Sequence, residues 1–182
     1  MDDAARKELL EIARQAVAAA VRGQNPPEVK PVSAELSEPR GAFVTIKNHG
    51  RLRGCIGQFV AEGPLFELVQ EMAVAAATRD PRFTFEPVTQ DELPDLDVEV
   101  SVLGPLEKID DPLDFDLGVH GIYIKRGFSH GCFLPQVATE TGWSKEEFLS
   151  HCASGKAGLA SNAWKDPKTE VLRFSCEVVS EH

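Results

Sequence analysis

The sequence predicts an α+β fold with a mainly antiparallel sheet flanked by helices. Two strand-like runs, 41–47 and 51–57, are separated by a short turn that ends at Gly50, which can adopt a positive φ. A run of alternating apolar and polar residues at 96–102 and a second hairpin within 121–134 add further strands. Because the strands follow one another as hairpins without regular βαβ alternation, antiparallel pairing is favoured.

Length and charge limit the classes of function. The chain has 182 residues with 42% hydrophobic content, which suits a single domain that buries roughly 70% of the surface of the unfolded chain. Lys and Arg number 19 against 29 Asp and Glu, so the net charge is −10. This negative field makes nucleic acid an unlikely partner. No membrane association is expected, since no stretch approaches the roughly 18 apolar residues that span a bilayer.

The cysteines and the first residues bear on the cell compartment. The four cysteines are far apart and form no CxxC pair, which argues against a zinc ribbon or a thioredoxin-type redox site. MDDAARKELL carries neither the basic start nor the apolar stretch of a secretory signal. No metal site is expected, because the Asp-rich stretch 110–116 lacks the spacing and glycine of an EF-hand. We therefore expect a cytoplasmic protein with reduced thiols.

Helical periodicity marks the first half of the chain. Apolar residues recur at three- and four-residue intervals over 2–22, which predicts an amphipathic helix. The connector 24–40 contains four prolines and is expected to be extended. The core follows over 41–180, within a single domain of 1–182. Inside this core, Pro64 suits the first turn of a second amphipathic helix.

Local signals also place the later elements. Thr89 with Glu92 forms a capping-box pattern for a short turn of helix, and Ser144 with Glu147 forms another before a longer helix. Apolar and polar residues alternate at 172–178, so the chain is expected to close with a strand.

One motif stands out among the candidate sites. The chain contains no GxxxxGK[ST], GxGxxG or HExxH pattern, but LRGCIG at 52–57 sets a cysteine between glycines. In a regular strand, Arg51, Arg53 and Cys55 share one face, and a nearby guanidinium favours a reactive thiolate. Alternatively, the cysteine is buried, the glycines allow tight packing and the arginines are solvated. The residues leave both interpretations open.

The motif and several later blocks resemble one known family. LRGCIG after GAFVTIK resembles the AMMECR domain family, in its prokaryotic branch that forms protein A of the three-part AmmeMemoRadiSam system. The resemblance spans nearly the whole chain through further blocks: AAATRDPRF at 75–83, the strand at 96–103, His120-Gly121, FLPQV at 133–137, KAGL at 156–159 and Trp164.

This resemblance implies a fold and a biological setting. The family forms one α+β unit of a larger and a smaller lobe, with LRGCIG beside the cleft between them. Its biochemical activity is uncharacterised, and it assigns no cofactor. The gene association implies a modification pathway shared with two possible partners, a Memo-like protein and a radical S-adenosylmethionine (radical SAM) protein. This is evidence by association alone.

The family blocks supply a set of candidate site residues. Cys55 is the candidate nucleophile and His120 the candidate general base. The candidate binding residues, which would hold a small anionic ligand, are Arg53, Gly54, Gly57, Asp80, Arg82, Gln136 and Lys156. Several have structural alternatives: Asp80 can shape a turn, Gln136 can cap a helix, and Lys156 can complement a helix C-terminus.

Two hypotheses of function follow. In the first, the protein is an enzyme that uses Cys55 in the LRGCIG motif, with Arg53 and Arg82 binding an anionic group. In the second, it is a non-catalytic binding or adaptor module for the Memo-like and radical SAM partners, and LRGCIG is mainly architectural.

Overall fold

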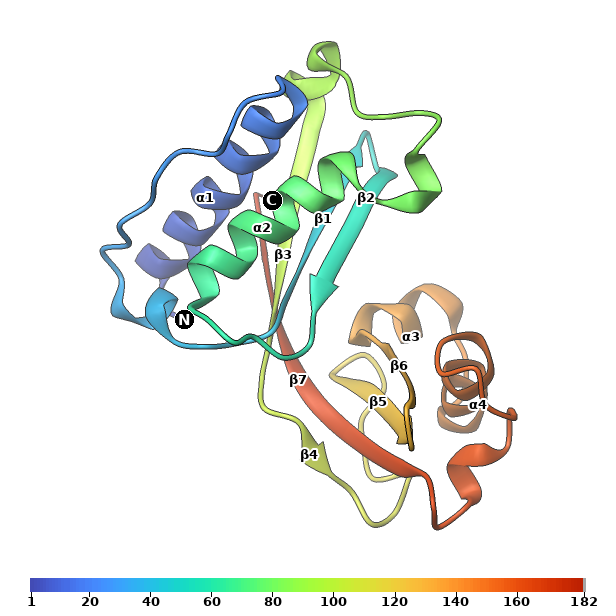
Figure 1. The fold of residues 1–182 in the computed structure, drawn as a ribbon. Helices are drawn as coiled ribbons and strands as arrows, with labels where there is room; N and C mark the ends of the chain where they lie inside the picture. Colours follow the sequence, from blue (N-terminus) through green and yellow to red (C-terminus); the bar gives the residue numbers. More distant parts are fainter. Residues whose placement is uncertain (182) are drawn as a thin grey trace. The chain divides into compact units, whose positions relative to one another are not determined.

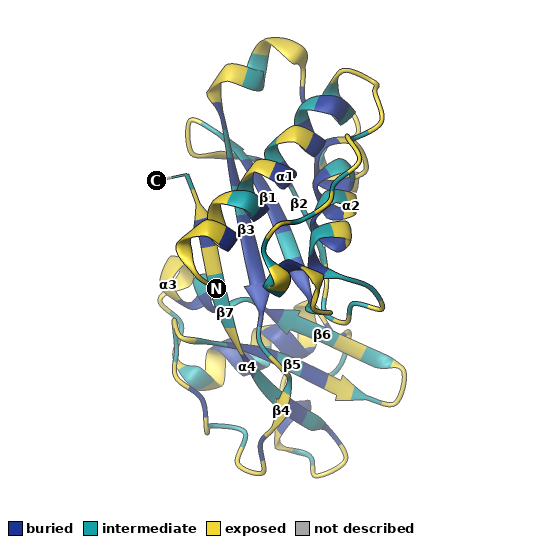
Figure 2. Ribbon diagram, turned by 90° about the vertical axis from the view of Figure 1, so that its left-hand side faces the viewer, coloured by how far each residue is buried: buried dark blue, intermediate teal, exposed yellow. Residues whose placement is uncertain are grey.

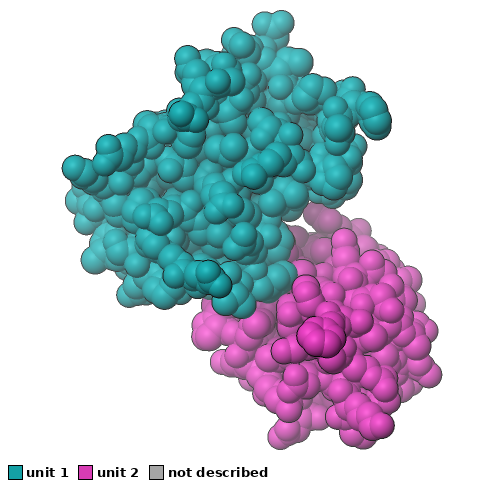
Figure 3. Space-filling model, viewed as in Figure 1, with its two compact units in different colours: residues 1–103, 177–182 teal, residues 104–176 magenta. Residues whose placement is uncertain are grey.

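The computed structural model describes residues 1–181 and separates them into two compact units. Unit 1 contains residues 1–103 and 177–181, and unit 2 contains residues 104–176 (Figure 3). Two strand pairs in unit 1 and three pairs that involve unit 2 are all antiparallel, as the hairpin pattern predicts. The expected α+β fold class is therefore confirmed.

The first helix of unit 1, α1 (Asp3–Val21), matches the predicted amphipathic helix. The Asp2 carboxylate caps its N-terminus by accepting the Ala5 backbone N–H at 2.8 Å. The buried side of the helix includes Leu9 and Val17. The proline-rich connector that follows contains a short 3₁₀ helix, η1 (Ala34–Ser37), within its otherwise extended course.

Three strands and the C-terminal end of a fourth form the sheet of unit 1. The hairpin pairs β1 (Ala42–Asn48) with β2 (Arg51–Gln58), and β3 (Leu96–Leu103) pairs with the other side of β1. The strand order is β2-β1-β3-β7, so β2 is an edge strand. Figure 2 shows buried residues concentrated on β1 and β3.

Helix α2 (Leu65–Thr78) lies beside α1 on one face of this sheet (Figure 1). The two helices and that face share one apolar core, which includes Leu9, Val44, Val69 and Val100. Two 3₁₀ helices, η2 (Pro81–Phe83) and η3 (Gln90–Asp95), connect α2 to β3. The capping box predicted at the start of η3 is confirmed.

Unit 2 has its own sheet and core. The strands β5 (His120–Arg126) and β6 (Ser129–Phe133) form the predicted second hairpin, and β7 (Glu170–Ser180) pairs with the other side of β5. The two-residue strand β4 (Glu107–Lys108) also pairs with β7.

Three helical segments complete unit 2: α3 (Pro135–Thr141), α4 (Lys145–Gly155) and η4 (Ala163–Lys165). The capping box predicted for Ser144 and Glu147 is present at the start of α4. The side chains of Phe115 and Phe148 meet in the core of this unit, with ring centroids 6.0 Å apart. Trp164 is buried in the same core, and its indole N–H donates to the Ser150 hydroxyl at 3.0 Å.

Candidate functional site

The LRGCIG motif lies on the edge strand β2, and an irregularity in its register changes which residues share a face. Ile46 pairs with Gly54 and Lys47 pairs with Leu52, so Arg53 is an extra residue with no partner on β1. Beyond this bulge, Arg51 lies opposite Asn48, whereas Cys55 lies opposite Thr45. Strand neighbours alternate between faces, so Arg51 and Cys55 point to opposite sides of the sheet. The expectation from the regular period that they share a face is wrong.

The two glycines of the motif allow other groups to pack directly against the backbone. A Cβ at Gly54 would collide with the carbonyl oxygen of Ala76 on α2, and a Cβ at Gly57 would collide with the Phe43 ring. Neither glycine has a positive φ, so their role is close approach and not an unusual backbone conformation. Glycine is therefore required at both positions for unit 1 to pack as it does.

Cys55 is half-buried, and its thiol and backbone are both hydrogen-bonded. The Thr45 hydroxyl donates to Cys55 Sγ at 3.2 Å. On the open edge of β2, the backbone N–H of Cys55 donates to Asp80 Oδ2 at 2.9 Å, and its carbonyl accepts from Arg82 Nη2 at 3.3 Å. Asp80 and Arg82 therefore occupy the position that a neighbouring strand would take at Cys55.

Asp80 and Arg82 form a compact ion pair at the start of η2. The Arg82 guanidinium donates to both carboxylate oxygens of Asp80, at 3.0 and 2.6 Å. The Asp80 carboxylate also accepts the Arg82 backbone N–H at 3.1 Å. Asp80 therefore shapes the turn, which is the structural alternative that the sequence analysis gave for it. The Arg82 guanidinium lowers the pKa of Asp80, whose side chain is only 1% exposed.

Arg53 is buried against a carboxylate that the sequence analysis did not connect with it. Its side chain is 4% exposed, and it donates to Glu92 Oε1 at 2.8 Å and to Glu92 Oε2 at 3.1 Å. The same guanidinium reaches the Pro87 carbonyl at 3.2 Å. Hydrogen bonds from Arg53 lower the pKa of Glu92 from 4.5 to about 2. Glu92 is thus both a helix-capping residue and the counter-ion of the motif.

The remaining candidates, His120, Gln136 and Lys156, belong to unit 2. Nδ1 of His120 accepts the Asp116 backbone N–H at 3.0 Å, which leaves Nε2 as the ring nitrogen that carries hydrogen in the neutral form. Gln136 lies inside α3, whose N-cap is Leu134, so the expectation that it caps this helix is wrong. Lys156 is the C-cap of α4, and its ammonium lies 5.9 Å from the centroid of the Phe133 ring.

Comparison with known proteins places the chain in a family. The AMMECR1 family profile matches residues 10–179. The chain belongs to the AMMECR1 family. A protein of Methanothermobacter thermautotrophicus is 43% identical over 95% of this chain and 92% of its own length, and a protein of Thermococcus kodakarensis is 42% identical over 95% and 88%.

A solved structure supports the same assignment. The crystal structure of an uncharacterised protein from Pyrococcus horikoshii matches with a TM-score of 0.86 and 36% sequence identity, over 98% of this chain and 91% of that one. This chain therefore shares its fold with that protein. The names of these relatives state no activity.

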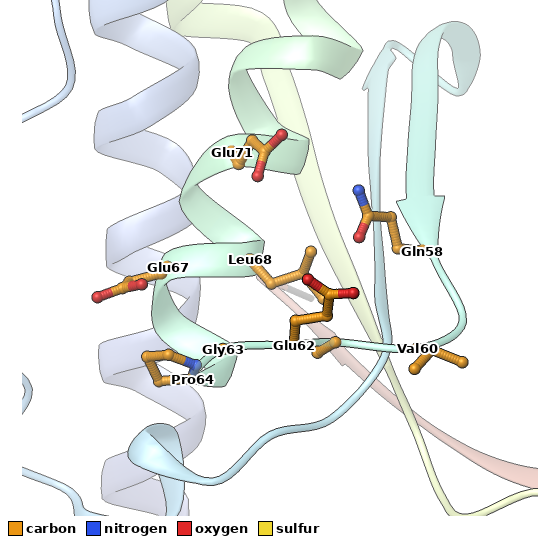
Figure 4. Close-up of a pocket in the computed structure, with 9 residues that line it drawn as sticks. Gln58, Val60, Glu62, Gly63, Pro64, Glu67, Leu68 and Glu71 are labelled. Atoms are coloured by element: carbon orange, nitrogen blue, oxygen red, sulfur yellow. The ribbon is translucent and has the colours of Figure 1, made fainter.

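The structure also locates a pocket away from the polar residues of the LRGCIG motif. A hollow of about 340 Å³ lies between the end of β2, the loop that follows it and the start of α2. Figure 4 shows Glu62, Glu67 and Glu71 around it, with Leu68 beside them. Among residues 1–181 no group of three or more His, Cys, Asp or Glu side chains is placed to hold a metal ion. None of the helices in the same range is long and apolar enough to cross a membrane.

Proposed function

We propose that this protein is a binding or adaptor module in which LRGCIG builds a rigid surface. The observation that supports this most strongly is that the buried polar groups around the motif hold the fold together. Arg53 is paired with Glu92, and Asp80 is bound by Arg82 and by the backbone of Cys55. Replacing such groups would disturb unit 1 itself.

The proposed partners are the Memo-like and radical SAM proteins that the family resemblance implies, in the cytoplasm. The test is co-expression of the full chain with each partner, followed by affinity capture and size-exclusion chromatography. We expect at least one partner to co-elute in a stable complex and Cys55→Ser to bind as well as the wild type. Failure of both partners to co-elute overturns the proposal.

The geometry at Cys55 supports a second candidate, an enzyme with a thiol nucleophile. The Thr45 hydroxyl that donates to Sγ would stabilise a thiolate. Arg82, whose guanidinium donates to the Cys55 carbonyl at 3.3 Å, would bind an anionic substrate, whereas His120 belongs to unit 2 and enters this candidate only through the family resemblance. In this case Cys55→Ser abolishes pathway function in cells while the folded protein and its complexes persist. Full pathway function of Cys55→Ser would overturn the enzyme hypothesis and leave the adaptor hypothesis.

A further inference from the structure

One carboxylate oxygen of Glu86 lies between two arginines of β2. Glu86 Oε2 accepts from Arg51 Nη2 at 2.8 Å but stops 4.0 Å from Arg53 Nη1, beyond hydrogen-bond distance. Within residues 1–181, Arg53 Nη1 is buried and has no hydrogen-bond partner. A buried charged donor without an acceptor is costly, so this N–H favours any acceptor that can come closer than Glu86 does.

One aromatic ring lies near this orphaned donor, and a second aromatic residue follows it closely in the chain. The guanidiniums of Arg53 and Arg82 lie 5.9 and 5.6 Å from the centroid of the Phe83 ring. Two residues further along the chain, Phe85 is fully exposed, at 102% of its reference area. Phe85 directly precedes Glu86, so an exposed aromatic side chain lies next in sequence to the carboxylate that Arg51 binds.

Each arginine here is paired with a carboxylate, and two of the guanidiniums stay exposed. Arg51 and Arg82 keep exposed fractions of 65% and 54% in a protein whose net charge is −10. Glu86 is itself 59% exposed, so it can leave Arg51 without unfolding its surroundings. A carboxylate from outside can therefore replace it.

We propose that Arg51, Arg53 and Phe85 form a docking surface for an acidic segment of a partner protein, whose carboxylate displaces that of Glu86. This inference rests on the proposed adaptor function and names the chemistry of the partner segment. An apolar residue next to the carboxylate would pack on Phe85. A protein segment suits this surface better than a small molecule does, because Arg51 and Phe85 are exposed and the hollow at Gln58 lies at the opposite end of β2.

The proposal makes Glu86 an internal competitor of the partner. Removing its charge should strengthen binding by roughly two- to fivefold, which corresponds to the strength of an exposed ion pair. Replacing Arg51 should weaken binding, since Arg51 would hold the incoming carboxylate in place of Glu86. Arg51 is exposed, so its replacement tests the surface without the unfolding that loss of the buried Arg53 could cause.

The experiment uses the full chain and an acetylated, amidated peptide with two glutamates between two leucines. NMR titration would follow the backbone signals of β2 and η2 and yield a Kd. We expect saturable binding, no binding of the peptide with glutamine in place of glutamate, tighter binding to Glu86→Gln, and at least fivefold weaker binding to Arg51→Ala and Phe85→Ala. Glu107→Gln is the matched control, because it removes an equally exposed carboxylate from an ion pair with Arg173 in unit 2. Equal affinity of all variants, or no saturable binding, overturns the docking surface.

Capture of the Memo-like and radical SAM partners separates this inference from the proposed function. If Arg51→Ala and Phe85→Ala capture the partners as well as the wild type does, the adaptor function stands and the proposed docking surface is refuted. If the wild type captures neither partner, the adaptor function itself fails, whatever the peptide does.

Discussion

Gly54 on β2 lies so close to Ala76 on α2 that any side chain at position 54 would collide with the Ala76 carbonyl oxygen. Because the obstacle is helix backbone and not a flexible side chain, Gly54→Ala must separate α2 from the sheet. We expect it to lower the free energy of unfolding by about 1–3 kcal/mol, the range for overpacked cores. Chemical denaturation monitored by circular dichroism measures this change.

Gly63→Ala is the matched control in the same unit. The nearest atom to a Cβ at position 63 is Glu67 Oε2 at 3.6 Å, which is an ordinary contact. Its stability should stay within about 0.5 kcal/mol of the wild type. If Gly54→Ala were equally harmless, the close packing of α2 on β2 would be refuted.

Loss of the Asp80 carboxylate should expose the edge of β2. Asp80→Ala leaves the Cys55 N–H and the Arg82 guanidinium without their acceptor, and we expect a loss of about 1–3 kcal/mol. Amide hydrogen exchange at Cys55 should speed up more than the overall loss of stability requires. Asp95→Ala, which removes a half-exposed carboxylate 3.9 Å from the exposed His49, should change neither quantity. Unchanged exchange at Cys55 in Asp80→Ala would contradict the edge-covering role.

The sequence predicts those features of this fold that depend on near neighbours. Helix periodicity over 2–22 and the two capping boxes join residues three or four positions apart, and both are present. The bulge at Arg53 is different, because it depends on how β2 aligns with β1. A regular period of two cannot reveal an inserted residue, so the prediction that Arg51 and Cys55 share a face failed at this point.

In the candidate site, too, the sequence predicted individual residues but not their long-range contacts. Sequence reasoning selected Arg53, Cys55, Asp80 and Arg82 individually, and the last three are in contact. It missed Glu92 as the partner of Arg53, because the two residues are 39 positions apart. The capping-box pattern identified Glu92 as a local residue only, and a carboxylate that satisfies one local role carries no signal of a second, long-range one.

The cysteines should differ strongly in their reaction with an alkylating agent. Cys152 is fully buried in unit 2, and burial raises the pKa of its thiol, so both access and thiolate formation are suppressed. In the native protein Cys152 should be the slowest of the four to react with iodoacetamide, as measured by mass spectrometry of peptides at pH 7–9. All four should react at similar rates in denaturant. Modification of native Cys152 as fast as that of half-buried Cys55 would contradict the packing of α4.

The ion pair between Arg53 and Glu92 should make unit 1 sensitive to acid. The pKa of Glu92 falls from 4.5 to about 2 on folding, which corresponds to about 3 kcal/mol of stability in the ionised state. Because the folded-state pKa is the lower one, this stability is complete well above pH 4.5 and is lost as the pH falls toward 2. Thermal unfolding should be measured for Glu92→Gln and the wild type from pH 7 to pH 2. We expect the variant to be less stable than the wild type at neutral pH, and this difference in stability to narrow below pH 4.5. Glu71→Gln, at an exposed position on α2, should follow the wild type throughout, and a constant gap for Glu92→Gln would refute the charge-dependent role of Glu92.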